Sequence, residues 1–291
     1  MPSDRRLQAD GLLVLVTILA AAGWFFSLYA LQSLPTMFFM GARFLLGGLI
    51  LACFGFRPLL SLGRRDLRRS VLTGIAMCAS MMFWVAGLLV SDNLGVGAFI
   101  CALGNIVAPL FGRVLFRIPV SRATWLAVGV ATAGLACLSL KDGIGFSLAD
   151  LYFLGTAVTN SLYLNLNNRY ASRIPVMPLA AIQLMVVGLL SLATSAARES
   201  WPTTVGMEAV GWFLASVLIS TSLRFFLLVR GQKTAPISHT ALIMNLEPVW
   251  TALLALICLG TAIGGIQLAG CGLIFLALVL HHLPWRGMRA F

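Results

Sequence analysis

Charged residues are scarce in this sequence. Asp, Glu, Lys and Arg make up 10% of the 291 residues, whereas 60% of the residues are hydrophobic. A soluble domain contains about 25% charged residues, so this chain has too little polar surface to enclose its apolar residues in water. The composition excludes an ordinary soluble protein and predicts a polytopic membrane protein.

Acidic residues are the rarest charged group. The chain has 9 Asp and Glu against 20 Lys and Arg, a formal net charge of +11. On a soluble protein this balance would indicate nucleic-acid binding. Here the basic residues lie in short segments between apolar runs, and no nucleic-acid-binding motif is found, so we predict no nucleic-acid partner. The densest cluster, residues 63–70, is interpreted as a topology anchor, with binding of a regulator or an anionic membrane lipid as the alternative.

Motifs for catalysis and for cofactors are missing. The six cysteines lie within or at the ends of apolar runs and form no C-x-x-C pair, so neither a disulfide framework nor a zinc site is predicted. There is no Walker A loop, no G-x-S-x-G and no H-E-x-x-H. We therefore predict no metal, no cofactor and no enzymatic activity, and an intramembrane hydrolase has little support.

Apolar runs fill the chain instead. A helix needs about 20 apolar residues to cross the hydrocarbon core, and ten such runs are found. They predict an all-α polytopic fold with ten transmembrane helices, at residues 11–31, 36–56, 70–90, 95–116, 122–140, 148–168, 176–196, 209–229, 236–258 and 262–282.

The distribution of cations predicts the orientation. If the N-terminus is cytoplasmic, the cytoplasmic segments hold sixteen Lys and Arg, and the outer segments hold only Lys141 and Arg198. This asymmetry obeys the positive-inside rule. We expect a multi-pass protein of the bacterial inner membrane with both termini in the cytoplasm.

The sequence also contains a weak internal repeat. A shift of 140 residues aligns span boundaries and several residues that match rarely by chance: Pro35 with Pro175, Met37 with Met177, Ser80 with Ser220, and Asn105 with Asn245. This predicts two five-helix halves, residues 1–140 and 141–291. Because five is odd, the second half must be inverted in the membrane, an arrangement typical of transporters with a substrate site between the halves.

Three stretches resemble a known family. They are "GWFFSLYALQSLPTMFFMGARFLLGGLIL" (residues 23–51), "ADLYFLGTAVTNSLY" (149–163) and "LEPVWTALLAL" (246–256). They resemble the ten-helix EamA-type exporters of the drug/metabolite transporter superfamily, and the likeness is greatest to a bacterial exporter of aromatic and other neutral amino acids. Many family members carry a glutamate after the fourth and ninth spans. This chain has no acid there, so a coupling role for that glutamate does not carry over.

Two proline-containing spans are the centre of the predicted site. Glu247 falls near the middle of the ninth span and is followed by Pro248. A charge at that depth is costly unless it is paired or hydrated, and each proline removes a backbone hydrogen bond. The fourth span repeats the pattern with Asn105 and Pro109, and the ninth adds Asn245. We interpret the two spans as lining a polar cavity with the prolines as hinges. The alternative is a packing kink, with Glu247 neutralised by a buried arginine.

Two arginines lie inside spans. Arg43 is interpreted as a structural tie between helices. Arg224 shares a helical face with Ser220 and Thr221 by its spacing. It either binds a substrate carboxylate, for which arginine is suited, or extends to the cytoplasmic surface.

Aromatic and polar residues in other spans complete the site. Trp24 offers a ring for an apolar or aromatic substrate, and asparagines in the sixth span should face the interior because lipid exposure would be unfavourable. The predicted substrate-binding residues are Trp24, Ser80, Trp84, Asn105, Asn160, Tyr163, Arg224, Asn245 and Glu247.

These features predict a secondary exporter of a small organic metabolite. An amino acid carries both charges, which suits a site with a cation, an acid and an aromatic ring. Proton exchange through Glu247 and facilitated diffusion both remain open as driving forces. Other solutes (quaternary amines, nucleosides or drugs) and a non-transporting membrane scaffold are the alternatives. The oligomeric state is left open, and a monomer is compatible with the sequence.

Overall fold

The computed structural model describes residues 3–116, 122–139, 147–171, 173–201, 204–234, 243–244, 246–260 and 264–282. Every regular element in this part of the chain is helical. In chain order the elements are α1 (Ser3–Ala30), α2 (Thr36–Phe54), α3 (Phe56–Leu60), α4 (Arg64–Val90), α5 (Leu94–Phe116), α6 (Arg122–Ser139), α7 (Leu148–Ala171), α8 (Val176–Arg198), α9 (Met207–Val217), the π-helical segment η1 (Leu218–Leu223), α10 (Arg224–Thr234), α12 (Glu247–Leu259) and α13 (Gly265–His282).

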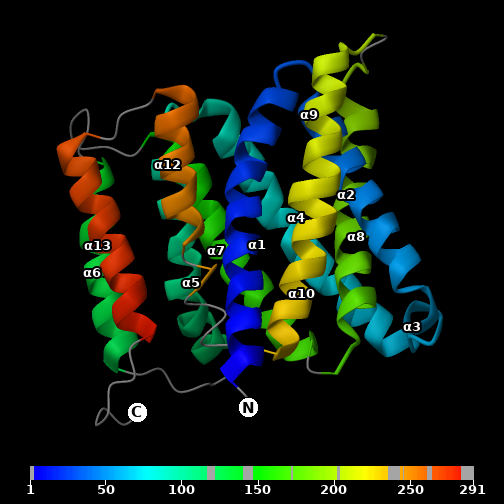
Figure 1. Ribbon diagram of the computed structural model, residues 1–291, viewed down its shortest axis with the longest axis horizontal. Helices are drawn as coiled ribbons and strands as arrows, with labels where there is room; N and C mark the ends of the chain where they lie inside the picture. The colour runs from blue at the N-terminus through cyan, green and yellow to red at the C-terminus, as the bar shows by residue number, and fades with distance from the viewer. Residues whose placement is uncertain are drawn as a thin grey trace.

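The helices lie side by side as a bundle (Figure 1). Each predicted span overlaps one helix, and α9, η1 and α10 together form the eighth. Within the described residues, five stretches are long and apolar enough to cross a membrane: Gly11–Ala30, Thr36–Phe54, Arg64–Val90, Val176–Arg198 and Met207–Leu228. The predicted all-α polytopic membrane fold is thereby confirmed. α1 begins and α13 ends at the same end of the bundle (Figure 1).

The closest helix pairs join the two halves of the chain. α2 packs along α8, α6 along α13, α4 along α7, and α1 along the α9–η1–α10 helix. Exchanging the halves by the 140-residue shift maps each of these pairs onto itself or onto another of them, as an approximate two-fold relation between repeats requires. The halves therefore interdigitate rather than stand apart as separate bundles, and the division of the chain at residue 140 stays a prediction.

Glycines allow the closest of these approaches. A Cβ atom added at Gly188 of α8 would lie 2.5 Å from the backbone nitrogen of Leu45 in α2, and one at Gly41 would lie 2.7 Å from that of Leu192 in α8. Between α6 and α13, a Cβ at Gly134 would lie 2.8 Å from the carbonyl oxygen of Gly270. Small residues let helix backbones touch, so these positions fix how tightly the repeat-related helices pack.

Replacing Gly188 by alanine is expected to lower the thermal stability of the detergent-purified protein. The added methyl group meets the backbone of α2, and overpacking of this kind costs about 1–3 kcal/mol. The matched control is Gly211→Ala in α9, where an added Cβ meets nothing within 4 Å and the better helix propensity of alanine favours the fold. Equal melting temperatures for the two variants would contradict the assignment of Gly188 to a close contact.

Glu199 joins the end of α8 to the beginning of α2. Its carboxylate oxygens accept hydrogen bonds from the backbone nitrogens of Met37 at 2.8 Å and Phe38 at 2.9 Å. The first backbone N–H groups of a helix have no intrahelical partner, and an anion is favourable there. One of the chain's few acids is thus used to cap α2.

Candidate functional site

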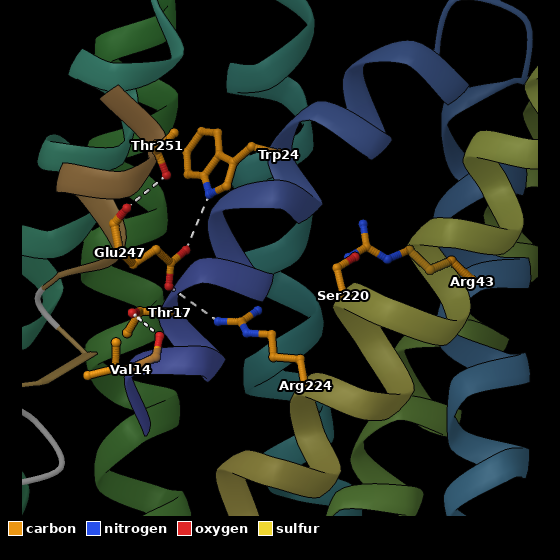
Figure 2. A network of polar contacts seen from close by, with 8 residues as sticks. All are labelled: Val14, Thr17, Trp24, Arg43, Ser220, Arg224, Glu247 and Thr251. Atoms are coloured by element: carbon orange, nitrogen blue, oxygen red, sulfur yellow. Dashed lines mark hydrogen bonds and ion pairs between the residues drawn. The ribbon is translucent and has the colours of Figure 1, made fainter. Parts of the chain in front are cut away.

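Two side chains from different helices, those of Trp24 and Arg224, contact the carboxylate of Glu247 at the start of α12. The indole Nε1 of Trp24 in α1 donates to Oε1 of Glu247 at 3.2 Å, and Nη2 of Arg224 in α10 lies 3.3 Å from Oε2. Figure 2 shows both side chains pointing to the carboxylate of Glu247, with Trp24 above it and Arg224 below it. We call Trp24, Arg224 and Glu247 the central triad. All three were predicted as site residues from separate spans.

The ion pair in the central triad is neither sealed nor tightly held. The side chains of Arg224 and Glu247 are 24% and 23% exposed. Their separation of 3.3 Å exceeds the 2.7–2.9 Å typical of charge-assisted hydrogen bonds. Arg224 therefore neutralises Glu247 instead of extending to the cytoplasmic surface. Pairing of Glu247 with an arginine was the alternative interpretation of the sequence, and the structure shows this pair with both side chains partly exposed.

Pro248 differs from its predicted place. α12 begins at Glu247 with Pro248 in its first turn, whereas the sequence suggested a kink within a continuous ninth helix. A proline in the first turn breaks no intrahelical bond, because that N–H would have no partner. Figure 1 shows α12 beginning about halfway along α1. The positive end of a helix dipole thus lies beside Glu247, inside the bundle. Asn245 lies outside the described residues, and a hinge at Pro248 stays a prediction.

An aromatic cluster packs behind Glu247. The ring of Trp24 lies edge-on to Trp84 of α4, with centroids 5.3 Å apart, and 5.6 Å from Phe153 of α7. Trp24 and Trp84 are buried, so in this state Trp24 serves mainly to orient the carboxylate through its N–H. Ser80 lies one turn from Trp84, is fully buried, and its Oγ has no hydrogen-bond partner among the described residues.

The predicted residues of α7 are tied to a neighbouring helix. Tyr163 donates its hydroxyl to Oε1 of Gln183 in α8 at 3.3 Å, and Nε2 of Gln183 donates to Asn167 at 2.9 Å. Asn160 is half-buried on α7. A role of these residues in substrate contact stays a prediction.

A second polar face of α7 was missed by the sequence analysis. Oγ of Ser161 donates to the carbonyl of Gly104 in α5, and Nδ2 of Asn165 donates to the carbonyl of Ala108, both at 2.7 Å. The i, i+4 spacing of Ser161 and Asn165 was the available signal. These bonds hold α5 just before Pro109, although the side chains of Asn105 and Pro109 lie outside the described residues.

Arg43 forms the predicted structural tie. Its Nε, Nη1 and Nη2 donate to Thr221 at 2.7 Å, Ser27 at 2.6 Å and Ser220 at 3.0 Å. The predicted bridge between helices is confirmed, since Ser27 lies on α1 and the other two hydroxyls lie on η1. Ser220 and Thr221, which the spacing placed on one face with Arg224, are thus both bonded to Arg43. Figure 2 shows Arg43 beside Ser220.

Two backbone carbonyl groups at the wide turn of η1 accept hydrogen bonds from side chains of η1 itself. Oγ1 of Thr221 donates to the carbonyl of Ser216 at 2.8 Å, and Oγ of Ser222 donates to that of Val217 at 2.9 Å, each five residues back. Single-turn π segments occur frequently at functional sites. Here the segment ends at Leu223, directly before Arg224, the cation of the central triad.

Comparisons with known proteins agree with this architecture. Residues 147–282 match the EamA-like transporter family. A protein of Acidianus ambivalens described as "Uncharacterized transporter in sor 3'region" is 26% identical over 251 residues, covering 85% of this chain and 94% of its own. A solved structure described only as "Crystal structure of protein" has a TM-score of 0.66 at 20% identity, covers 96% of both chains, and supports the fold alone. Residues 147–282 are thus similar to the EamA-like transporter family, and 85% of the chain is similar to a protein described as a transporter.

Proposed function

We propose that this protein is a secondary transporter that exports small organic metabolites, specifically aromatic and other neutral amino acids, across the bacterial inner membrane by alternating access. The observation that supports it is the central triad, in which a partly exposed acid and cation are paired between apolar helices. Ionisable groups inside membrane spans are rare and usually functional. Apart from the transported solute, the proposal requires only the surrounding membrane lipid as a partner.

The chemistry of the site suits an amino acid. The guanidinium of Arg224 and the carboxylate of Glu247 complement the carboxylate and the ammonium of one zwitterion. Trp84 and Phe153, together with Trp24, form a buried aromatic cluster beside them. We expect an aromatic or other neutral side chain to pack against this cluster when the helices move apart, while an additional charge would have no partner there.

Alternating access must move bodies that contain helices of both halves. Since α2 packs along α8 and α6 along α13, sliding residues 1–140 past residues 141–291 would break the closest contacts in the bundle. We expect the motion to concentrate at the start of α12 beside Pro248, at the π-helical segment η1, and at the predicted hinge Pro109 in α5.

Transport into liposomes tests the proposed function. The purified protein is reconstituted and given phenylalanine and other amino acids, nucleosides and quaternary amines, with and without a pH gradient. Saturable counterflow of phenylalanine is the expected result. Movement of a nucleoside or a quaternary amine in its place would transfer the proposal to another solute class. No movement of any solute would favour a non-transporting scaffold.

Replacement of Glu247 by glutamine separates the two driving forces. If protons are exchanged at Glu247, the variant is expected to lose accumulation driven by a pH gradient, because glutamine cannot bind and release a proton. Counterflow of phenylalanine should persist, since it requires no proton. Accumulation that responds to pH as in the unmodified protein would reject proton exchange at this residue.

A further inference from the structure

The groups around Glu247 form a site for a carboxylate. Trp24 directs an N–H at one carboxylate oxygen, and Arg224 directs its guanidinium at the other. The beginning of α12 adds the positive end of a helix dipole. We call this set of donors the carboxylate site. In the structure its ligand is the side chain of Glu247 itself.

Glu247 uses the carboxylate site incompletely. Arg224 reaches it through one nitrogen, and its Nε is buried without a hydrogen-bond partner among the described residues. Arginine normally binds a carboxylate through two parallel N–H groups. The backbone of α12 fixes Glu247 and limits its approach, whereas a free carboxylate could align with two nitrogens of Arg224.

The other intramembrane arginine shows the contrast. Arg43 is 5% exposed, and all three of its nitrogens donate to hydroxyls. Arg224 has an unused buried donor and an accessible, loosely held partner. An incoming anion is therefore expected at Arg224 and not at Arg43.

We propose that Glu247 is a tethered stand-in for the carboxylate of the transported solute. This inference rests on the proposed export function. On binding, the solute carboxylate takes Arg224, Glu247 is displaced, and a cationic group of the solute becomes its new partner. The site then selects zwitterions, because an acid without an ammonium would leave Glu247 unpaired and an amine without a carboxylate would leave Arg224 unpaired.

Binding of three related compounds tests the exchange. The probes are phenylalanine, 3-phenylpropanoate, which lacks the ammonium, and 2-phenylethylamine, which lacks the carboxylate, with acetate as a small acid that needs no aromatic pocket. Affinities are measured by calorimetry on the unmodified protein, Glu247→Gln, Arg224→Gln and the double variant. The unmodified protein should bind phenylalanine more tightly than either analogue by about tenfold or more.

Glu247→Gln is expected to strengthen binding of 3-phenylpropanoate and acetate by about tenfold, because no internal carboxylate competes for Arg224. Phenylalanine should change little, since the lost ammonium partner is offset by the lost competitor. The double variant should lose the gain for both acids, and Arg224→Gln should bind 2-phenylethylamine more tightly. Absence of any gain for both acids in Glu247→Gln overturns the inference.

Failure of the proposed function gives a different result. If phenylalanine is neither bound nor transported, yet Glu247→Gln gains an Arg224-dependent affinity for acetate, the amino-acid proposal falls and the carboxylate site stands. Should Glu247→Gln fail to fold, Glu247→Asp replaces it, because the shorter side chain withdraws the anion from Trp24 and Arg224. A partial gain for acetate is then expected, and no gain overturns the inference.

Discussion

Replacing Arg224 by glutamine is expected to abolish amino-acid transport and to destabilise the protein, while a second replacement, Glu247→Gln, should restore stability without restoring transport. The single variant leaves the carboxyl group of Glu247 among apolar helices with the Trp24 N–H as its remaining donor. Removing one partner of a fully buried pair costs about 3–5 kcal/mol. Because both side chains are about a quarter exposed, we expect a loss of about 1–3 kcal/mol.

The double variant, Arg224→Gln with Glu247→Gln, measures whether the two charges interact. With both charges removed, no ion is left unpaired, so its stability should exceed the value obtained by adding the two single losses. Thermal unfolding in detergent measures stability, and counterflow in liposomes measures transport. Arg198→Gln, at the exposed end of α8, is the control for loss of one positive charge. Strict additivity of the two single variants would show that Arg224 and Glu247 do not interact.

The sequence predicted where a helix begins when a proline directly precedes an apolar run long enough to cross the membrane. Pro35 and Pro175 precede α2 and α8, and both starts were predicted at the observed residues. The ninth span was predicted as one run, yet α12 begins at Glu247. Hydropathy measures the transfer of side chains into lipid and does not report at which residue a helix begins. The pairing of α2 with α8 across the halves was likewise unreadable, because pairing depends on surface shape.

The central triad was within reach of sequence reasoning because charge limits the choices. An acid in an apolar span needs a partner, and few cations lie inside spans. The hydroxyl contacts gave a weaker signal, since Ser and Thr in helices can bond to their own backbone. The run "SVLISTS" (residues 216–222) holds four hydroxyl residues within an apolar span. That density was the available sign of η1, but it did not name Arg43 as the partner.

The second large effect is expected at Arg43. Replacing it by lysine should destabilise the protein nearly as strongly as replacing it by glutamine, although lysine keeps the charge. Arg43 reaches hydroxyls on two helices through three separate nitrogens. A single ammonium cannot reproduce that geometry, and it would remain buried with no carboxylate near it in the described part of the chain. We expect losses of about 2–4 kcal/mol for either variant.

Two variants of Thr221 distinguish the loss of its hydrogen bond to Arg43 from a general loss of packing. Thr221→Ser keeps the hydroxyl that accepts a hydrogen bond from Nε of Arg43 and donates one to the carbonyl of Ser216. Its melting temperature should therefore be close to that of the unmodified protein. Thr221→Val keeps the shape and removes the hydroxyl, and it should lose about 1–3 kcal/mol. Because η1 leads directly into Arg224, Thr221→Val should also weaken phenylalanine binding, and Thr221→Ser should not. If Arg43→Lys and Thr221→Val both match the unmodified protein in melting temperature and affinity, the hydroxyl bridge does not hold η1, and the orientation of Arg224 must come from its pairing with Glu247 alone.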